Sequence, residues 1–396
     1  MLRRLSFITA GESHGPGLTA LLTGLPAGLP VDFALLEREM ARRQHGFGRG
    51  RRMAIEQDRA EIRGGVRGGE TIGSPVALWI ENRDWTNWQQ VMGIAEGDVD
   101  PHRAELRRVK SPRPGHVDLP GGLKYDRRDL RDVLERASAR ETAARVAAGA
   151  FAKMLLAELG IEIKSGVRSL GSVGVDRPTP TWDDLLGVDD GSPLRAIDRA
   201  LEPEMIALVE QAKDEGETLG GAVTVIARGV PVGLGSYVQW SDKLDGRLAQ
   251  AVLSVHAIKA VEIGSGIAAS RGFGSSAHDP IELVEGRFVR PSNRAGGLEG
   301  GVTNGEDVVI TAYKKPIATL RKGLPSVDLD TLSAAPSQYE RSDVTALPAA
   351  GVIVEAMVAL VLADALLEKL GGDSLAEVKA HYEATKALQK RWPDRS

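Results

Sequence analysis

The sequence predicts an α+β fold without a Rossmann domain, for two reasons. Segments with strand and helix patterns follow one another without a regular β-α-β alternation. In addition, no G-x-G-x-x-G motif stands between a strand and a helix. We therefore expect an α+β sandwich, formed by a single domain over residues 1–396. Proline, glycine and aspartate are concentrated in residues 171–203, where two internal halves of this domain could meet.

In the first part of the chain, residues 5–10 are predicted to form a strand that ends at the glycine-rich turn GESHG. An aspartate can cap a helix over residues 32–44, where apolar side chains have helical spacing. Residues 75–82 have the pattern of a strand. Residues 82–126 contain four prolines and are expected to be mostly loop.

The second part of the chain begins with a predicted long helix over residues 126–159, whose alanine-rich middle allows close packing of backbones. The remaining elements are expected to be strands and helices of ordinary length. The strands are predicted at residues 161–167, 220–230 and 306–316, and the helices at residues 203–216, 242–264 and 349–370.

Composition and charge exclude several classes of protein. Cysteine is absent, which fits a reducing compartment, and the seven histidines lack the spacing of a metal site. The start of the chain has no apolar run long enough for a signal peptide, and we expect a cytoplasmic protein. The apolar segment at residues 351–370 is interrupted by Glu355, Asp364 and Glu368, which favours a buried helix over a membrane span.

Basic residues gather in two segments, residues 38–52 and 103–113, although the net charge is −4. A nucleic-acid-binding protein would usually be basic overall and rich in stacking aromatic residues, whereas aromatic residues are only 4% here. Glycine accounts for 46 of 396 residues, which indicates many tight turns and close approaches of the backbone. These features predict binding of small anions and no nucleic-acid partner.

The turn GESHG matches the G-x-S-x-G pattern of a hydrolase nucleophile elbow, with Ser13 as the nucleophile. An elbow needs an oxyanion hole that an earlier loop helps to form, and only ten residues precede the motif. The motif could instead be an ordinary turn at the end of a strand. In a third interpretation, His14 lies in a pocket and donates a proton near neutral pH.

Three further segments have both a structural and a functional interpretation. His116 follows Arg113 on a rigid turn and could be an exposed loop residue or part of a site. Arg136 and Arg140, one helical turn apart in an apparently buried stretch, could pair with Asp132, Glu135 or Glu141, or could bind a ligand anion. Arg341 and Asp343 could be a local ion pair, or could hold a ligand and supply a base.

Taken together, eight segments in order resemble the chorismate synthase family. They are GESHG, RRQHGFGRGRRM, RPGH, LERASARETAARVAAGA, HAIKAVEIGSG, NRAGGLEGGVTNG, KKPIATL and RSDVTALPAAGVIVEAMVALVLADALLEK. They extend from residue 11 to about residue 370. The resemblance implies a β-α-β sandwich with helices between antiparallel sheets, usually assembled as a homotetramer.

The resemblance also implies the reaction: 5-enolpyruvylshikimate 3-phosphate loses phosphate and a ring proton to give chorismate. This last common step of the shikimate pathway requires reduced FMN but has no net redox change. The electrons for FMN could come from NADPH or from a separate flavin reductase, and an external source is expected because no reductase domain is recognisable.

By resemblance, His14 protonates the departing phosphate, His116 lies beside the reduced flavin, and Asp343 is the base that acts through flavin N5. The segments that match flavin contacts are Arg136, Ala137, Ser138, His256, Ala257, Gly300, Lys315, Pro316, Ile317, Ala318, Thr319 and Arg341. The positions that match NADP contacts are Arg43 and Arg49, and those expected to bind the substrate are Arg52, Arg113 and Arg140.

One position departs from the family pattern, because many members have Asn or Gln where this chain has His256. A histidine can donate a hydrogen bond as an amide does, but its charge can vary with pH. Two other classes of function remain open at this point: a non-catalytic flavin- or polyanion-binding protein, and a serine hydrolase. The presence of both histidines and Asp343 favours the enzyme over a binding protein.

Overall fold

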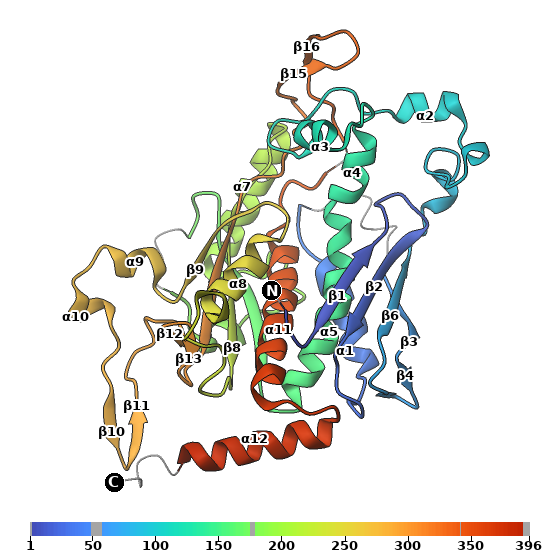
Figure 1. Ribbon diagram of the computed structural model, residues 1–396. Coiled ribbons are helices and arrows are strands. Elements are labelled where there is room, and N and C mark those ends of the chain that lie inside the picture. Colours follow the sequence, from blue (N-terminus) through green and yellow to red (C-terminus); the bar gives the residue numbers. More distant parts are fainter. Residues whose placement is uncertain (1, 49–57, 175–178, 341, 391–396) are drawn as a thin grey trace.

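The computed structural model describes residues 2–48, 58–174, 179–340 and 342–390. Two four-stranded antiparallel sheets and the helices that pack against them form the body of the molecule (Figure 1). The predicted α+β class is confirmed. The division of the domain into halves near residues 171–203 stays a prediction.

The first sheet has the strand order β1-β2-β6-β3. Its strands are β1 Ser6–Ala10, β2 Gly17–Thr23, β6 Val76–Glu81 and β3 Ala60–Gly64. Alternate residues of β2 and β6, such as Leu18, Leu22, Leu78 and Ile80, are buried. This period of two leaves one face of the sheet for the core, and α5 packs against that sheet.

The second sheet has the strand order β7-β8-β14-β9. Its strands are β7 Glu162–Leu170, β8 Gly221–Arg228, β14 Val308–Lys314 and β9 Ile258–Ile263. The central strands β8 and β14 are almost continuously buried, as expected for strands covered on both faces. The helix α11 packs against β7 and β8.

Three helices form the centre of the body: α1 Phe33–Gln44, α5 Thr142–Ala157 and α11 Leu347–Leu370. The helix α11 is long and apolar enough to cross a membrane, but its apolar window is entirely buried. It packs closely along α5, where Gly149 lies against Ala356. This confirms that α11 is a core helix.

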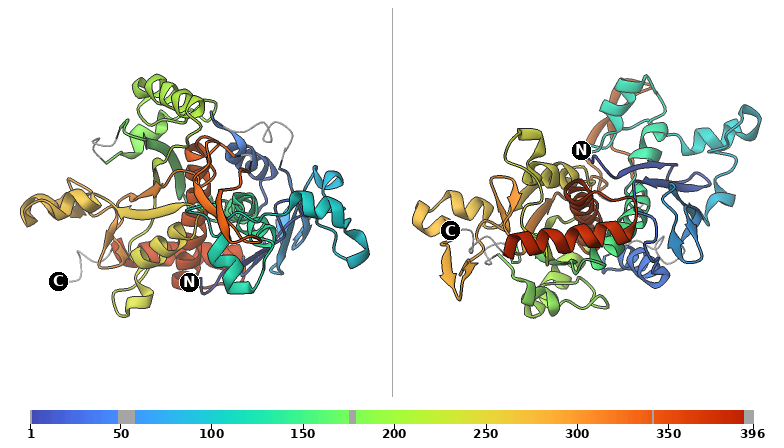
Figure 2. Two further views of the ribbon diagram at one scale, coloured as in Figure 1. Left: turned by 90° about the horizontal axis from the view of Figure 1, so that it is seen from above. Right: turned by 60° about the horizontal axis from the view of Figure 1, so that its bottom comes forward.

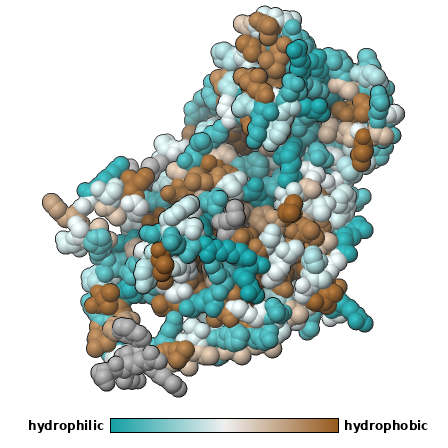
Figure 3. All heavy atoms as spheres, viewed as in Figure 1, coloured by the Kyte–Doolittle hydropathy of each residue, from teal (hydrophilic) through white to brown (hydrophobic). Residues whose placement is uncertain are grey.

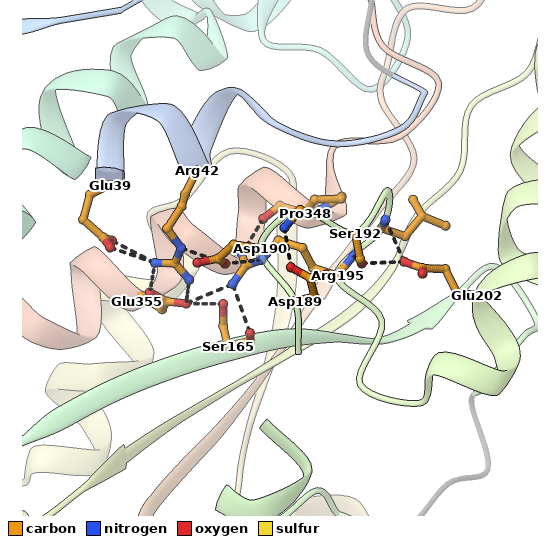
Figure 4. Close-up of polar contacts among 12 residues, drawn as sticks. Glu39, Arg42, Ser165, Asp189, Asp190, Ser192, Arg195, Glu202, Pro348 and Glu355 are labelled. Carbon is orange, nitrogen blue, oxygen red and sulfur yellow. Dashed lines mark hydrogen bonds and ion pairs between the residues drawn. The ribbon is translucent and has the colours of Figure 1, made fainter. Parts of the chain in front are cut away.

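A buried ion network joins these helices to β7 (Figure 4). The carboxylate of Glu355, fully buried in α11, accepts hydrogen bonds from Arg42 at 2.8 and 2.9 Å and from Lys153 at 2.5 Å. Burial alone would raise the pKa of Glu355, but the charges of Arg42 and Lys153 hold it well below its usual value. The oppositely charged groups of this network therefore neutralise one another inside the protein, and their contacts hold α1 in place relative to α11.

Shorter elements surround this body. The remaining helices are α2 Pro101–Arg107, α3 Asp118–Tyr125, α4 Arg131–Ala137, α6 Trp182–Leu186, α7 Glu202–Asp214, α8 Leu244–Leu253, α9 Gly266–Ser270, α10 Gly274–Ala277 and α12 Leu375–Lys390. The paired short strands are β4 Val66–Arg67 with β5 Glu70–Thr71, β10 Glu282–Val284 with β11 Arg287–Val289, β12 Leu298–Glu299 with β13 Val302–Thr303, and β15 Pro325–Asp328 with β16 Ser333–Pro336.

The shorter elements also determine the outline of the molecule. The segment that contains α9, α10, β10 and β11 projects from the body, and α12 crosses one end of it (Figure 2). The face of the molecule in Figure 3 mixes hydrophilic side chains with scattered hydrophobic ones, as is usual for a protein surface.

Two predicted helices were wrong in detail. The helix over residues 126–159 is interrupted: α4 ends at Ala137, Ser138 is extended, and α5 begins at Thr142. The helix over residues 242–264 ends at Leu253, because the later residues pair with β14 as strand β9. Residues 82–126 are mostly loop, as expected, although they also contain α2 and α3. Long-range strand pairing and a local serine cap thus overrode helix propensity.

Candidate active site

The motif GESHG lies between β1 and β2, so it connects a strand to a strand. A nucleophile elbow requires a turn between a strand and a helix, and the structure therefore excludes the elbow. Ser13 is only 3% exposed, and its hydroxyl oxygen accepts a hydrogen bond from Ser138 at 3.1 Å.

His14, in the same turn, is 7% exposed and contacts α4. Its backbone N–H donates to Oε2 of Glu135 at 2.7 Å, and its ring Nδ1 is 2.8 Å from Oε1 of the same carboxylate. The imidazole also lies against the ring of Trp88, with 3.8 Å between the centroids and 31° between the planes. The histidine ring is thus held both at one nitrogen and across one face.

Glu135 is buried, and it also accepts a hydrogen bond from Arg131 at 3.0 Å. Burial alone would raise the pKa of Glu135, but the hydrogen bonds of His14 and the charge of Arg131 lower it below its usual value. The carboxylate is therefore ionised near neutral pH.

His116 has a similar arrangement in the RPGH turn. Its Nδ1 is 2.6 Å from Oδ1 of Asp118, which is fully buried at the start of α3. Arg113 donates to both oxygens of this carboxylate, at 2.8 and 2.9 Å, and to Oγ1 of Thr319 at 3.0 Å. Burial would raise the pKa of Asp118, but His116 and Arg113 hold it far below its usual range.

Several segments predicted to contact flavin meet at this turn. Nζ of Lys315 donates to the backbone oxygen of Gly115, and the backbone N–H of Lys315 donates to the oxygen of Ala257 at 2.9 Å. Ser342 donates to the backbone oxygen of Thr319 at 3.1 Å, which places the half-buried Asp343 next to the segment 315–319. Residues far apart in the sequence, including Pro316, Ile317 and Ala318 between these anchors, are thus brought together.

The cationic residues expected near the site differ in exposure. Arg140 is buried and pairs with Asp58 at 3.1 Å, not with Asp132, Glu135 or Glu141. Arg43, expected to contact NADP, is 5% exposed and donates to the same Asp58. Burial would raise the pKa of Asp58, but these two charges lower it. The expectation that Arg136 is buried was wrong, because its side chain is 43% exposed.

Arg136 and His256 line a cavity of about 310 Å³. Arg136 donates to the backbone oxygens of Gly11 at 3.1 Å and Thr9 at 2.8 Å. Among the described residues, no partner is found for the buried Nδ1 of His256. The other lining residues are Phe7, Thr9, Glu141, Arg145, Ser254 and Met357. A cavity with two arginines and an unpaired buried ring nitrogen suits a phosphorylated ligand that can hydrogen-bond, such as FMN.

Burial lowers the pKa of His256 to about 4, and the charges of Arg145, His116 and Arg136 act in the same direction, whereas Glu141 opposes them. The imidazole is therefore neutral at physiological pH. It can act there as a neutral hydrogen-bonding group.

The remaining residues predicted from the sequence lie in different places: one is remote from the two histidine turns, two are next to GESHG, and three are outside the described residues. Gly300 is exposed in the turn between β12 and β13, beside α8, and this turn lies apart from α3 in Figure 1. Ala137 and Ser138 lie at the end of α4, next to the GESHG turn. Arg49, Arg52 and Arg341 lie outside the described residues. Within residues 2–48, 58–174, 179–340 and 342–390, no group of acidic and histidine residues could hold a metal.

Trp88, Asp118 and Asp58 were not predicted from the sequence, and neither was the contact of Glu135 with His14. Asp118 is two residues from His116, and this H-x-D spacing was a usable signal. Glu135 had been considered only as a partner of the arginines. Trp88 and Asp58 gave no signal, because they approach the site only through the packing of distant segments.

Comparison with known proteins supports a single family. The family model described as chorismate synthase matches residues 5–367. Chorismate synthases of Acidobacterium capsulatum and Moorella thermoacetica are 53% and 54% identical to this chain, and each alignment covers 96% of this chain and 98% of the relative. A crystal structure of chorismate synthase shares 43% identity and superposes with a TM-score of 0.79, covering 99% of this chain and 100% of the other. The chain therefore belongs to the chorismate synthase family.

Proposed function

We propose that His14, His116 and Asp343 carry out the proton chemistry of the reaction that this family catalyses. The enzyme is a lyase of the shikimate pathway, and it removes phosphate and a ring proton from 5-enolpyruvylshikimate 3-phosphate to give chorismate. The observation that carries the assignment is the pairing of each histidine, through Nδ1, with a buried carboxylate. A surface histidine would not need such support.

In this proposal, His14 acts through Nε2 and protonates the departing phosphate, because its Nδ1 is engaged by Glu135. The carboxylate of Asp343 finally accepts the ring proton. Arg113 and Arg140, together with Arg52, provide the positive field that favours an anionic substrate and stabilises the charge that develops on the leaving phosphate. The buried carboxylates Asp118 and Asp58 hold two of these arginines in place.

Reduced FMN supplies the electron chemistry of carbon–oxygen cleavage when it is bound. The residues proposed to hold it are Arg136, Ala137, Ser138, His256, Ala257, Arg341 and the segment Lys315 to Thr319, whereas Gly300 lies apart from them in this chain and is not included. Two observations support this assignment: the cavity beside His256, and the contacts that join Lys315 to both Gly115 and Ala257. His116 lies on the same turn and is proposed to set the protonation state on this side of the site.

An anaerobic assay with dithionite-reduced FMN tests the proposed roles. We expect phosphate release from 5-enolpyruvylshikimate 3-phosphate, a loss of about 10²–10⁴-fold in His14→Ala, and a smaller loss in Ser13→Ala. Loss of turnover in Ser13→Ala, with His14→Ala unaffected, would reject the role of His14 and favour serine chemistry.

The source of electrons and the assembly are also proposed. We infer that a separate flavin reductase supplies reduced FMN to a cytoplasmic homotetramer, with NADPH as the alternative donor at Arg43 and Arg49. The buried pairing of Arg43 with Asp58 favours the external source. NADPH oxidation by the purified protein with FMN would contradict it, and sedimentation at several protein concentrations measures the assembly.

A further inference from the structure

Glu135 contacts the GESHG turn through both of its carboxylate oxygens and through its backbone oxygen. Its two carboxylate oxygens accept from the backbone N–H and meet the ring Nδ1 of His14, and its backbone oxygen accepts from the N–H of Ser13 at 2.9 Å. We propose that Glu135 is a positioning residue that keeps the proton of His14 on Nδ1, so that proton exchange with the substrate occurs at Nε2. This inference rests on the proposed role of His14.

The tautomer follows from the chemistry of the two partners. An ionised carboxylate has no proton to donate, so the 2.8 Å contact requires a proton on Nδ1. Glu135 is kept ionised by its contacts with His14 and Arg131, despite its burial. The neutral form of His14 then has its lone pair on Nε2, and the protonated form donates from that atom.

The charge of Glu135 is important because other groups near His14 oppose a positive charge on its imidazole ring. Among the described residues, two arginines face the same aromatic ring: the guanidinium carbons of Arg107 and Arg131 lie 4.7 and 5.3 Å from the centroid of Trp88. Trp88 stacks on His14, so both cations oppose a positive charge on the imidazole. Glu135 is an anionic group in direct contact with the ring, and its charge offsets theirs.

The second histidine provides a contrast within the same site. Nη2 of Arg113 is 3.0 Å from Nδ1 of His116, the same atom that meets Asp118. Arg113 also occupies both oxygens of that carboxylate. An arginine thus engages both oxygens of Asp118, whereas Arg131 engages only the oxygen of Glu135 that meets the ring of His14, and the other oxygen of Glu135 faces the backbone N–H of His14. We therefore expect control of the tautomer to be stronger at His14.

The decisive variant is Glu135→Gln, which preserves shape and removes the charge. One carboxylate oxygen faces the backbone N–H of His14, and the other faces both Nδ1 and Arg131. Whichever way the amide is turned, its NH₂ group meets a donor. The matched control is Glu262→Gln, because Glu262 is also a buried carboxylate, bonded to Tyr313 at 2.6 Å and to Arg168 at 3.3 Å.

Two measurements on the full-length protein test the proposal. Steady-state phosphate release with reduced FMN, measured from pH 5 to 9, should show kcat reduced about 10–100-fold in Glu135→Gln, with KM changed much less. The basic limb of its pH profile should move to lower pH, because a negative charge next to the ring has been removed. Glu262→Gln should retain the profile of the unchanged protein.

The second measurement needs neither substrate nor flavin. Histidine ring ¹⁵N shifts of the unchanged protein, assigned by the signals lost in His14→Gln, should show the Nδ1–H tautomer at high pH. An Nε2–H tautomer would overturn the proposal even if Glu135→Gln failed to fold. Equal losses in Glu135→Gln and Glu262→Gln, with an unchanged pH profile, would also overturn it. Absence of turnover in the unchanged protein would reject the proposed function. The ¹⁵N measurement of the His14 tautomer would still test the proposed role of Glu135 in that case.

Discussion

The close contact between α5 and α11 gives a stability prediction with a defined sign. A Cβ atom added at Gly149 would lie 2.4 Å from the Cβ and 2.7 Å from the Cα of Ala356. Ordinary carbon contacts are about 3.5–4 Å, so the two core helices would have to separate by roughly 1 Å. Overpacking of this kind costs up to about 3 kcal/mol when the obstacle is backbone, whereas alanine gains about 1 kcal/mol in helix propensity.

The expected net effect of Gly149→Ala is a loss of about 2 kcal/mol of folding free energy. With an unfolding entropy of about 2.1 cal/mol/K per residue, a chain of 396 residues should lose roughly 2–3 °C of Tm. Differential scanning calorimetry at fixed protein concentration measures this shift. Concentration must be fixed because association contributes to the apparent stability.

Gly246→Ala in α8 is the matched control, because a Cβ at that position meets no atom within 4 Å. The same chemical change should stabilise the protein there by roughly 0.5–1 kcal/mol. A Tm of Gly149→Ala equal to or above that of the unchanged protein, with Gly246→Ala behaving as expected, would refute the close-contact argument.

Three other outcomes are expected. Asp343→Asn should keep FMN affinity, measured by flavin titration, and lose at least about 10²-fold in turnover; unchanged turnover would reject Asp343 as the base. The pKa of Asp118 is lowered in the folded state, so the stability it contributes is present above pH ~4 and is lost as the pH falls further. Asp118→Asn should remove that pH dependence and cost about 3–5 kcal/mol at pH 7 in urea unfolding. The pKa of His256 falls from 6.5 to about 4 on folding, so unfolding takes up a proton between these values and stability should rise with pH across that window. In His256→Asn this slope should disappear, and a slope that persists would contradict the buried neutral imidazole.

The sequence was sufficient for the elements whose pattern is local. The patterns of β6 and β8 and the apolar run of α11 identified two strands and a core helix correctly, because burial leaves a local trace in the sequence, either alternation or a continuous apolar run. It was insufficient at Ser138 and at β9. A serine cap breaks the alanine-rich helix, a local contact that the helix propensity of the surrounding alanines obscured. Pairing with β14 converts a helix-like segment into a strand, and this competitor is not visible in a local window.

The candidate site shows the same division between local and distant information. His14, His116 and the basic segments could be located from composition, glycine-rich turns and family resemblance. Their partners could not, since Glu135 reaches His14 across 121 residues and Arg113 reaches Thr319 across 206. The sequence by itself determined which chemical groups are available and which turns present them. The tertiary structure decided which carboxylate faces which histidine, because charge and proton positions depend on contacts within a few ångströms, which only the packing of distant segments creates.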